Sequence, residues 1–113
     1  MSDSAVLAEV TKDDFRDVVS EGTVLVDIWG PDCQPCLTLL PHVEALAEKY
    51  AGEMKVVKLE APKARRLCME LGVMSLPGFL LFRDGEEVAR LSDAALTPQR
   101  LDQWLDEQRK EVS

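Results

Sequence analysis

Short apolar runs alternate with helix-patterned segments along this chain, and that alternation restricts the folds open to it more than any other feature. The run Val24-Leu-Val-Asp-Ile-Trp29 is too short for a helix and rich in β-branched residues, so it predicts a buried strand. Thr11-Lys-Asp-Asp14 resembles a helix-opening capping box and predicts a helix through about Val19. Apolar residues at helical spacing predict a long helix from about Cys33 to Tyr50. Shorter strand candidates lie at Val6 to Val10 and at Lys55 to Leu59.

The second half of the chain carries strong turn signals. Asp84-Gly85 separates two apolar runs and predicts a tight hairpin, and Gly72 is a natural end for a short helix. Thr97-Pro98 offers an N-cap and a first-turn proline for a final helix. The elements expected here are a helix over Ala64 to Leu71, strands over Phe79 to Phe82 and Glu87 to Leu91, and a helix from Gln99 to about Glu107. The order β-α-β-α-β-α-β-β-α predicts an α/β fold with helices on both sides of a mixed sheet.

Length and charge narrow the classes of protein and partner. The 113 residues suit one domain, expected over residues 1–113, with no room for a second core. The formal net charge of −8 repels phosphate backbones and anionic lipids, which disfavours nucleic acid and membranes as partners. No apolar run approaches the length of a membrane-spanning helix, and the first residues lack the pattern of a secretory signal. We therefore expect a cytoplasmic protein in a reducing compartment.

Two of the three cysteines stand close together, in Cys33-Gln-Pro-Cys36. The pair follows a predicted buried strand and opens a predicted helix, so both sulfurs fall at the carboxyl end of a strand, where α/β sheets place their sites. The positive end of the helix stabilises a thiolate on Cys33, and Cys36 is close enough to close a disulfide. Redox chemistry is the leading interpretation, with Gln34 and Pro35 shaping the site.

Zinc sites use the same cysteine spacing, so a metal site is the alternative. It would need further ligands from Cys68 or His42, at spacings that match no common zinc pattern. Cys68 is interpreted as a half-buried packing residue, and His42 as a surface residue. We therefore expect neither a metal nor a bound cofactor.

Asp27 interrupts the most apolar strand candidate. A carboxylate on a strand that is covered on both faces is desolvated, which raises its pKa and suits it to proton transfer. The alternative is a polar side chain on the solvent face of a one-sided strand. Lys58 is expected either near Asp27, where it would tune the carboxylate, or at a solvated strand end. Trp29 is expected to pack beside the site.

Leu76-Pro77 falls between a helix end and a buried strand, which makes it a candidate cis peptide bond, although few X-Pro bonds in folded proteins are cis. With these residues in place, the chain resembles the thioredoxin family over nearly its whole length, from about Val6 to Glu107. The matching segments are, in order, Val24-Leu-Val-Asp-Ile-Trp29, Cys33-x-Pro-Cys36, Pro41, Val57-Lys-Leu59, Gly72-Val-Met-Ser-Leu-Pro77 and Phe79-Leu-Leu-Phe-Arg-Asp-Gly85.

The resemblance implies a thioredoxin fold, with Pro77 in a cis bond opposite the cysteines. It implies that Cys33 is the attacking thiolate, Cys36 the resolving thiol, and Asp27 a buried proton acceptor with Lys58 beside it. The implied activity is the reduction of protein disulfides by dithiol–disulfide exchange. The implied protein is a monomer whose partners are disulfide-containing proteins and a thioredoxin reductase or an equivalent electron donor.

Four positions depart from the usual pattern of the family. Asp32 and Gln34 replace the tryptophan and the glycine around the first cysteine, Gly78 stands where threonine is usual, and Ala94 about where a glycine is usual. Because these positions belong to the surface on which partners dock, we expect a narrowed range of substrates. The alternative is a thioredoxin-like binding or adaptor module with little general reductase activity.

Overall fold

A five-stranded sheet forms the centre of the molecule in the computed structural model, which describes residues 7–112. The elements along the chain are β1 (Ala8–Val10), α1 (Phe15–Val18), β2 (Thr23–Trp29), α2 (Gln34–Lys49), β3 (Lys55–Glu60), the 3₁₀ helix η2 (Ala61–Lys63), α3 (Arg65–Leu71), β4 (Gly78–Arg83), β5 (Glu86–Ser92) and α4 (Pro98–Val112). The strand order is β1-β3-β2-β4-β5; β1, β3 and β2 are parallel, and β4 and β5 are antiparallel to their neighbours. The predicted mixed α/β sheet is confirmed.

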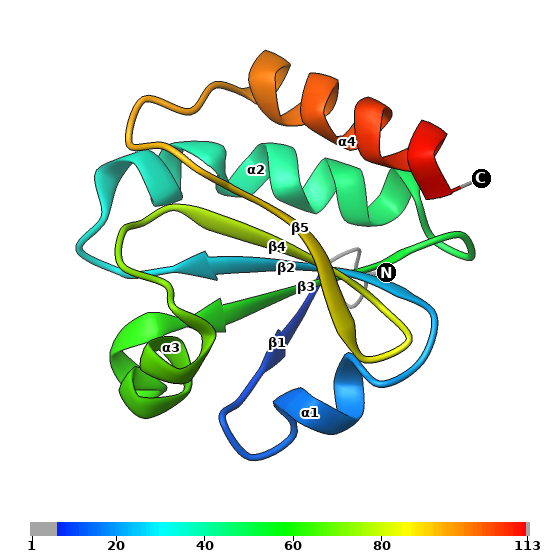
Figure 1. The fold of residues 1–113 in the computed structure, drawn as a ribbon. Helices are drawn as coiled ribbons and strands as arrows, with labels where there is room; N and C mark the ends of the chain where they lie inside the picture. Colours follow the sequence, from blue (N-terminus) through cyan, green and yellow to red (C-terminus); the bar gives the residue numbers. More distant parts are fainter. Residues whose placement is uncertain (1–6, 113) are drawn as a thin grey trace.

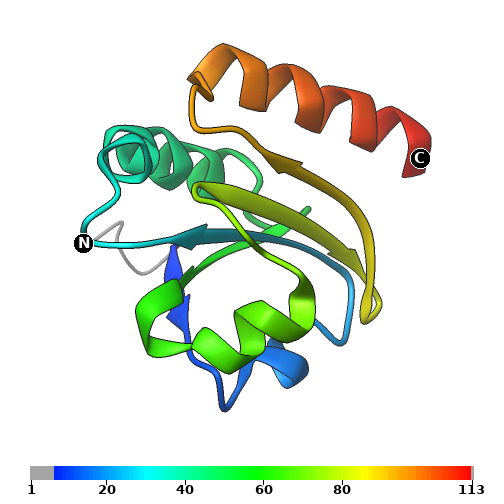
Figure 2. The ribbon, with the colours of Figure 1, turned by 60° about the vertical axis from the view of Figure 1, so that its left-hand side comes forward.

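Helices cover both faces of the sheet, α2 and α4 on one side and α1 and α3 on the other (Figure 1). The turned view in Figure 2 shows the same two layers. Because strand side chains alternate between faces, β2 contributes to two separate apolar clusters. Leu25 packs with α2 and α4, whereas Val24, Val26 and Ile28 pack with α1 and α3. Asp27 lies on the same face of β2 as Leu25, the face covered by α2 and α4.

The ends of the helices differ slightly from the predicted bounds. Thr11 and Asp14 exchange hydrogen bonds as a capping box would, but the helix α1 begins only at Phe15 and ends at Val18. The last helix runs on to Val112, past the predicted end at Glu107, because its final residues include no glycine or proline to stop it. Val6, the start of the first strand candidate, lies outside the described residues.

The turn signals identified in the sequence are confirmed. Gly72 ends α3 with a φ of 72°, and the hairpin residues Asp84 and Gly85 have φ of 50° and 91°, as a tight turn between twisted strands requires. The amides of Asp84 and Gly85 donate to the carbonyls of Gly22 and Val19, and Asp84 Oδ1 accepts from the amide of Gly22. The hairpin tip is therefore tied to the turn between α1 and β2, at the end of the sheet where β2 begins.

Candidate active site

A disulfide joins Cys33 and Cys36 at the start of α2. Cys33 is the N-cap of the helix and its Sγ accepts a hydrogen bond from the amide of Cys36 at 3.2 Å. Pro35 lies in the first turn, where its missing N–H leaves no helical hydrogen bond unmade. Cys36 is 2% exposed, whereas Cys33 is half-buried between the exposed side chains of Asp32 and Gln34. Solvent can therefore reach the first sulfur, while the helix buries the second.

The environment at the start of α2 favours negative charge on sulfur. Free N–H groups and the positive end of the helix dipole stabilise an anion at the N-cap. Once the disulfide is reduced, that anion would be a thiolate on Cys33. The pair thus has the two properties that dithiol exchange needs: an accessible sulfur in a stabilising field and a second sulfur one turn away.

Asp27 is buried in the strand that leads to this pair, with an exposed fraction of 1%. Neither of its carboxylate oxygens has a hydrogen-bond partner among the described residues. Desolvation raises the pKa of Asp27 to about 7; the positive charge of Lys58 acts to lower it and the negative charge of Glu9 to raise it. Of the two interpretations drawn from the sequence, the structure supports the buried carboxylate. A group that titrates near neutral pH suits proton exchange with a thiol.

Lys58 lies beside Asp27 in the adjacent strand, because the two residues pair in register across β2 and β3. On its other side Lys58 pairs in register with Glu9 of β1, and its Nζ lies 3.8 Å from Glu9 Oε1. Its Nζ also lies 5.1 Å from the centroid of the Trp29 ring, a cation–π distance. The indole N–H of Trp29 donates to Glu9 Oε2 at 3.3 Å. Three charged residues thus form a row across three strands, with Trp29 beside it.

No motif in the sequence marks Glu9 as a residue of the site. It is a charged residue in a short strand candidate, and that pattern alone suits an exposed strand position. Its importance comes from the register that places it opposite Lys58, and register between parallel strands is not encoded in a local motif. Because side chains alternate along a strand, the buried Val10 indicates that Glu9 lies on the opposite face of the strand, but not which residues it meets there.

The Leu76–Pro77 peptide bond is cis, as the family resemblance implied. Gly78, the next residue, pairs with Ile28 near the end of β2, so the loop reaches the end of the sheet where α2 begins. Leu76 packs closely against this end of β2: a Cβ on Gly30 would lie 3.3 Å from Leu76 Cδ1. The loop and the segment that leads into the cysteines are therefore packed together.

Strand β5 holds this loop through hydrogen bonds that the sequence did not predict. Ser92 Oγ lies 2.9 Å from Ser75 Oγ and donates to the carbonyl oxygens of Ser75 at 3.4 Å and Pro77 at 3.3 Å. The guanidinium of Arg90 donates to the carbonyl oxygens of Leu71 at 2.7 Å and Gly72 at 3.2 Å. Both ends of the loop, the close of α3 and the start of β4, are thus bound to one strand.

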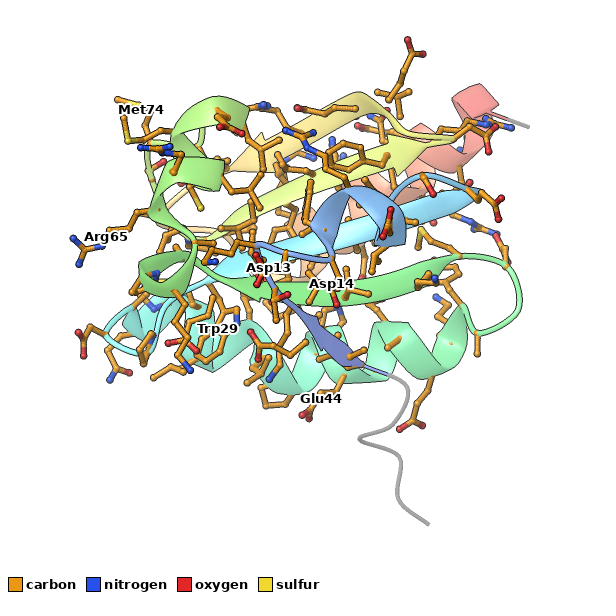
Figure 3. The ribbon with its side chains drawn as sticks, turned by 90° about the horizontal axis from the view of Figure 1, so that it is seen from below. Asp13, Asp14, Trp29, Glu44, Arg65 and Met74 are labelled. Atoms are coloured by element: carbon orange, nitrogen blue, oxygen red, sulfur yellow. A yellow bond between two sulfur atoms is a disulfide. The ribbon has the colours of Figure 1, made fainter. Side chains whose placement is uncertain are left out.

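A hollow of about 400 Å³ lies beside this loop. Its lining residues are Ala61, Pro62, Arg65, Cys68, Met69, Val73 and Leu76. Met69 is 79% exposed and Met74, in the adjoining loop, is 93% exposed. Figure 3 shows Arg65 and Met74 projecting outwards on this side of the molecule. Exposed methionines next to a hollow form an adaptable apolar surface.

Two residues differ from their sequence-based interpretation. His42 is half-buried, not a free surface residue: its Nε2 lies 2.7 Å from Asp102 Oδ1, because α4 packs beside α2. Cys68 is 8% exposed, hence buried rather than half-buried, and burial raises the pKa of its thiol, which disfavours the reactive thiolate. Within residues 7–112, no three His, Cys, Asp or Glu side chains gather closely enough to hold a metal ion. The same residues include no helix that is both long and apolar enough to cross a membrane.

Comparisons with known proteins agree with this geometry. The family model described as Thioredoxin matches residues 6–107. The chain is 38% identical over 104 residues to a thioredoxin of Peptoclostridium acidaminophilum, covering 90% of this chain and 94% of that protein. It is 35% identical over 82 residues to a thioredoxin of Bacillus subtilis, covering 73% of this chain and 79% of that protein. The oxidised form of mitochondrial thioredoxin 3 from Saccharomyces cerevisiae has a similar fold, with a TM-score of 0.80 at 22% identity over 94% of this chain and 99% of that one.

Proposed function

The chain belongs to the thioredoxin family and is a thiol–disulfide oxidoreductase, and from that premise we propose that it reduces disulfides in proteins. The observation that carries the proposal is the asymmetric disulfide at the start of α2, with Cys33 reachable and Cys36 buried. Such an asymmetry suits a reaction in which one sulfur meets the substrate and the other completes the exchange.

The reaction begins when the Cys33 thiolate attacks one sulfur of a substrate disulfide. This step forms a mixed disulfide and releases the other substrate sulfur as a thiolate, which takes up a proton. Cys36 then loses its proton to Asp27 and attacks the Cys33 sulfur. The second substrate sulfur leaves, and the protein is left with the Cys33–Cys36 disulfide. Two electrons pass from the protein dithiol to the substrate, so each cycle needs a two-electron donor to restore the dithiol.

Asp27 fits the role of acceptor for chemical reasons. Its pKa of about 7 lies close enough to that of a thiol for proton exchange near neutral pH. Its oxygens have no hydrogen-bond partner among the described residues, so no bond need be broken before it accepts a proton. Asp27 lies on the face of β2 that α2 covers, and α2 carries Cys36 on its buried side.

The loop at Leu76–Pro77 and the hollow beside it are the proposed docking surface for the substrate chain. The same end of the sheet, near the cysteines, also holds Trp29 at the end of β2 and Gln34 and Pro35 at the start of α2. The exposed Met69 and Met74 offer apolar contact at its rim. The electron donor would be a thioredoxin reductase or an equivalent enzyme, and we propose a cytoplasmic protein that acts as a monomer in cellular electron transport.

A second candidate function is a thioredoxin-like binding module with little general reductase activity. The observation that favours it is the set of altered docking positions: Asp32 and Gln34 are exposed beside Cys33, and Ala94 is exposed in the loop before α4. A charge and a longer side chain there would weaken docking of general substrates while a dedicated partner could still bind.

Insulin reduction with a thioredoxin reductase as donor, run beside a titration of the reduction potential, separates the two functions. The proposed reductase should turn over insulin, and the double variant Asp32→Trp with Gln34→Gly should do so faster. Cys33→Ser should abolish turnover, whereas the control Ser20→Ala should retain it, because Ser20 lies in the turn before β2 and the disulfide follows the other end of that strand. A normal potential without insulin turnover in the protein, with turnover appearing in the double variant, would favour the binding module, because the altered docking positions would then exclude general substrates.

The assignment of the attacking sulfur is tested by limited alkylation of the reduced protein with iodoacetamide. Cys33 should react first, because its thiolate is stabilised at the N-cap and solvent reaches it, whereas Cys36 and Cys68 are buried. Mass spectrometry of the labelled peptides gives the order of reaction. Earlier labelling of Cys36 would reverse the proposed roles.

A further inference from the structure

We propose that Glu9 is a positioning residue of the redox site: its carboxylate holds the Lys58 ammonium and the Trp29 indole on the β1 side of the sheet, which keeps Lys58 from pairing with Asp27. This inference rests on the proposed function, in which Asp27 accepts a proton from Cys36. It assigns a role to a side chain that reaches the site through its contacts with Trp29 and Lys58.

The geometry places Lys58 between two carboxylates. Glu9, Lys58 and Asp27 lie in one row across β1, β3 and β2, paired in register. The ammonium of Lys58 lies 3.8 Å from Glu9, yet neither oxygen of Asp27 has a hydrogen-bond partner in residues 7–112. Of the two carboxylates beside it, Lys58 therefore contacts the more exposed one, Glu9, and not Asp27.

Differences in solvation explain this choice. The side chains of Glu9 and Lys58 are 39% and 20% exposed, whereas Asp27 is 1% exposed. A lysine keeps its charged head towards water where it can, and pairing with Asp27 would draw that head into the sheet. Glu9 supplies a partner at the wetter end of the row. Asp27 is consequently left with a desolvated carboxylate that has no hydrogen-bond partner among residues 7–112, although the charge of Lys58 still acts on it from the adjacent strand.

Trp29 is held by the same carboxylate. Glu9 Oε2 accepts the indole N–H at 3.3 Å while Glu9 Oε1 faces Lys58, whose Nζ lies over the Trp29 ring. One side chain therefore fixes both the position of the ring, four residues before Cys33, and the direction of the lysine. The charge of Glu9 and its hydrogen-bond acceptor can therefore be removed by different substitutions and tested separately.

Few other ionisable groups face Asp27. Lys58 on β3 and Glu9 on β1 are the charges that act on it. On β4 its register partner is Phe79, which carries no charge, and α2 contributes the buried Cys36 thiol once the disulfide is reduced. Glu60, two residues beyond Lys58, pairs with Lys63 at 3.6 Å.

The test follows the protonation of Asp27 itself in the oxidised protein, by the carbon-13 shift of its carboxyl group against pH. Glu9→Gln keeps the size and an acceptor for Trp29 but removes the charge that holds Lys58. The titration midpoint of Asp27 should then fall by about one pH unit or more, because a negative charge is gone and Lys58 is free to approach. Asp13→Asn removes the same charge at a side chain that is 83% exposed, and serves as the matched control.

Two further variants separate the contacts. Glu9→Ala should also move the proton shift of the Trp29 indole N–H, which Glu9→Gln should leave nearly unchanged. In a Lys58→Met background, Glu9→Gln should move the Asp27 midpoint by less than it does with Lys58 present. An equal movement in both backgrounds would mean that Glu9 acts by its own charge and not by holding Lys58.

The outcomes distinguish this inference from the proposed function. A midpoint in Glu9→Gln that equals the Asp13→Asn control, or rises, overturns the role of Glu9. A midpoint that falls together with slower disulfide reduction near pH 7 supports both proposals, since a weaker base accepts the Cys36 proton less readily. A midpoint that falls with no change in rate upholds the contacts of Glu9 and contradicts proton transfer to Asp27.

Discussion

The two neighbours of β2 support the disulfide end of the sheet in different ways. On the β3 side, charged groups form a row, and the last of them, Asp27, is buried without a hydrogen-bond partner among the described residues. On the side of β4 and β5, a set of hydrogen bonds to carbonyl and hydroxyl oxygens holds the loop at Leu76–Pro77. The β3 side sets the pKa of Asp27, whereas the side of β4 and β5 sets the backbone path of the loop at Leu76–Pro77.

Both sides contain a cation beside a carboxylate, which makes the difference instructive. Arg90 pairs with Glu87 on β5 and donates two further N–H groups to the backbone carbonyls of Leu71 and Gly72. Lys58 pairs with Glu9 and has a second, buried carboxylate next to it. A cation–carboxylate pair thus anchors a loop on β5, whereas the pair of Lys58 and Glu9 lies beside the buried Asp27, whose desolvated carboxylate responds more strongly to nearby charges.

The largest expected effect concerns the pH dependence of folding stability on the β3 side. The pKa of Asp27 in the folded protein is about 7, raised from 3.8. Between these values the folded chain holds a proton that the unfolded chain releases, so stability falls as pH rises from about 4 to 7. By linkage the loss attributable to Asp27 reaches about 4 kcal/mol above pH 7.

Denaturant titrations of the oxidised protein and of Asp27→Asn measure this loss. The difference in unfolding free energy between variant and wild type should grow in favour of the variant across pH 4 to 7 and then level off. Asp13→Asn should show no such window, because its side chain is exposed. A difference in unfolding free energy that stays constant across the pH range would show that Asp27 is solvated. The β3 side would then not differ from the side of β4 and β5 in the way described.

A smaller effect is expected on the side of β5, from Ser92→Ala. Losing the hydroxyl that contacts Ser75 and Pro77 should cost about 1 kcal/mol of unfolding free energy. The KM for protein disulfides should rise severalfold because the docking loop is less well held, while the reduction rate of a small disulfide and its pH profile stay unchanged. Ser92→Thr restores the hydroxyl and should restore the KM.

Ser20→Ala is a suitable control for that experiment. Ser20 Oγ donates to the carbonyl of Asp17 at 2.7 Å, far along the sheet from the loop, so its loss should not alter the KM. A shift of the pH profile in Ser92→Ala would mean that the β5 side also acts on the proton, and that the division of roles proposed above is wrong.

The smallest effect is expected from Asp32, which carries a negative charge directly before Cys33 but is exposed. Asp32→Asn removes a charge that disfavours the thiolate, so the reduction potential should rise. Screening by solvent and salt should keep the rise below about 10 mV at physiological ionic strength. Titrations at low and high salt test this, since a rise that persists at high salt would place Asp32 among the influential charges with Asp27.

The sequence predicted the parts of the site that are local. The strand-to-helix junction located Cys33 and Cys36, and the polar residue in an apolar strand located Asp27. Hydrophobic periodicity and turn residues depend on a few neighbouring positions, so a single sequence is enough to predict the strands, helices and turns that they specify. The cis bond at Pro77 came from resemblance to a family and not from the residues alone.

The parts that were missed depend on contacts between distant segments. Glu9 matters because of its register with β3, and Ser92 because β5 pairs with β4 opposite Gly78. His42 was expected at the surface, but α4 brings Asp102 against it sixty residues later. A single sequence states which side chains exist, while strand register and helix packing decide which of them meet.

The hydrogen bonds that join Asp84 and Gly85 to Gly22 and Val19 mark a part of the molecule that suits the attachment of labels or supports. They close the end of the sheet where β2 begins, while the disulfide follows the end of the same strand. A dye, a resin or an electrode attached at the exposed Glu86 would therefore leave Cys33 facing outwards. Oriented coupling through that position would let every immobilised molecule present its sulfur to the solution, which random coupling through lysines would not.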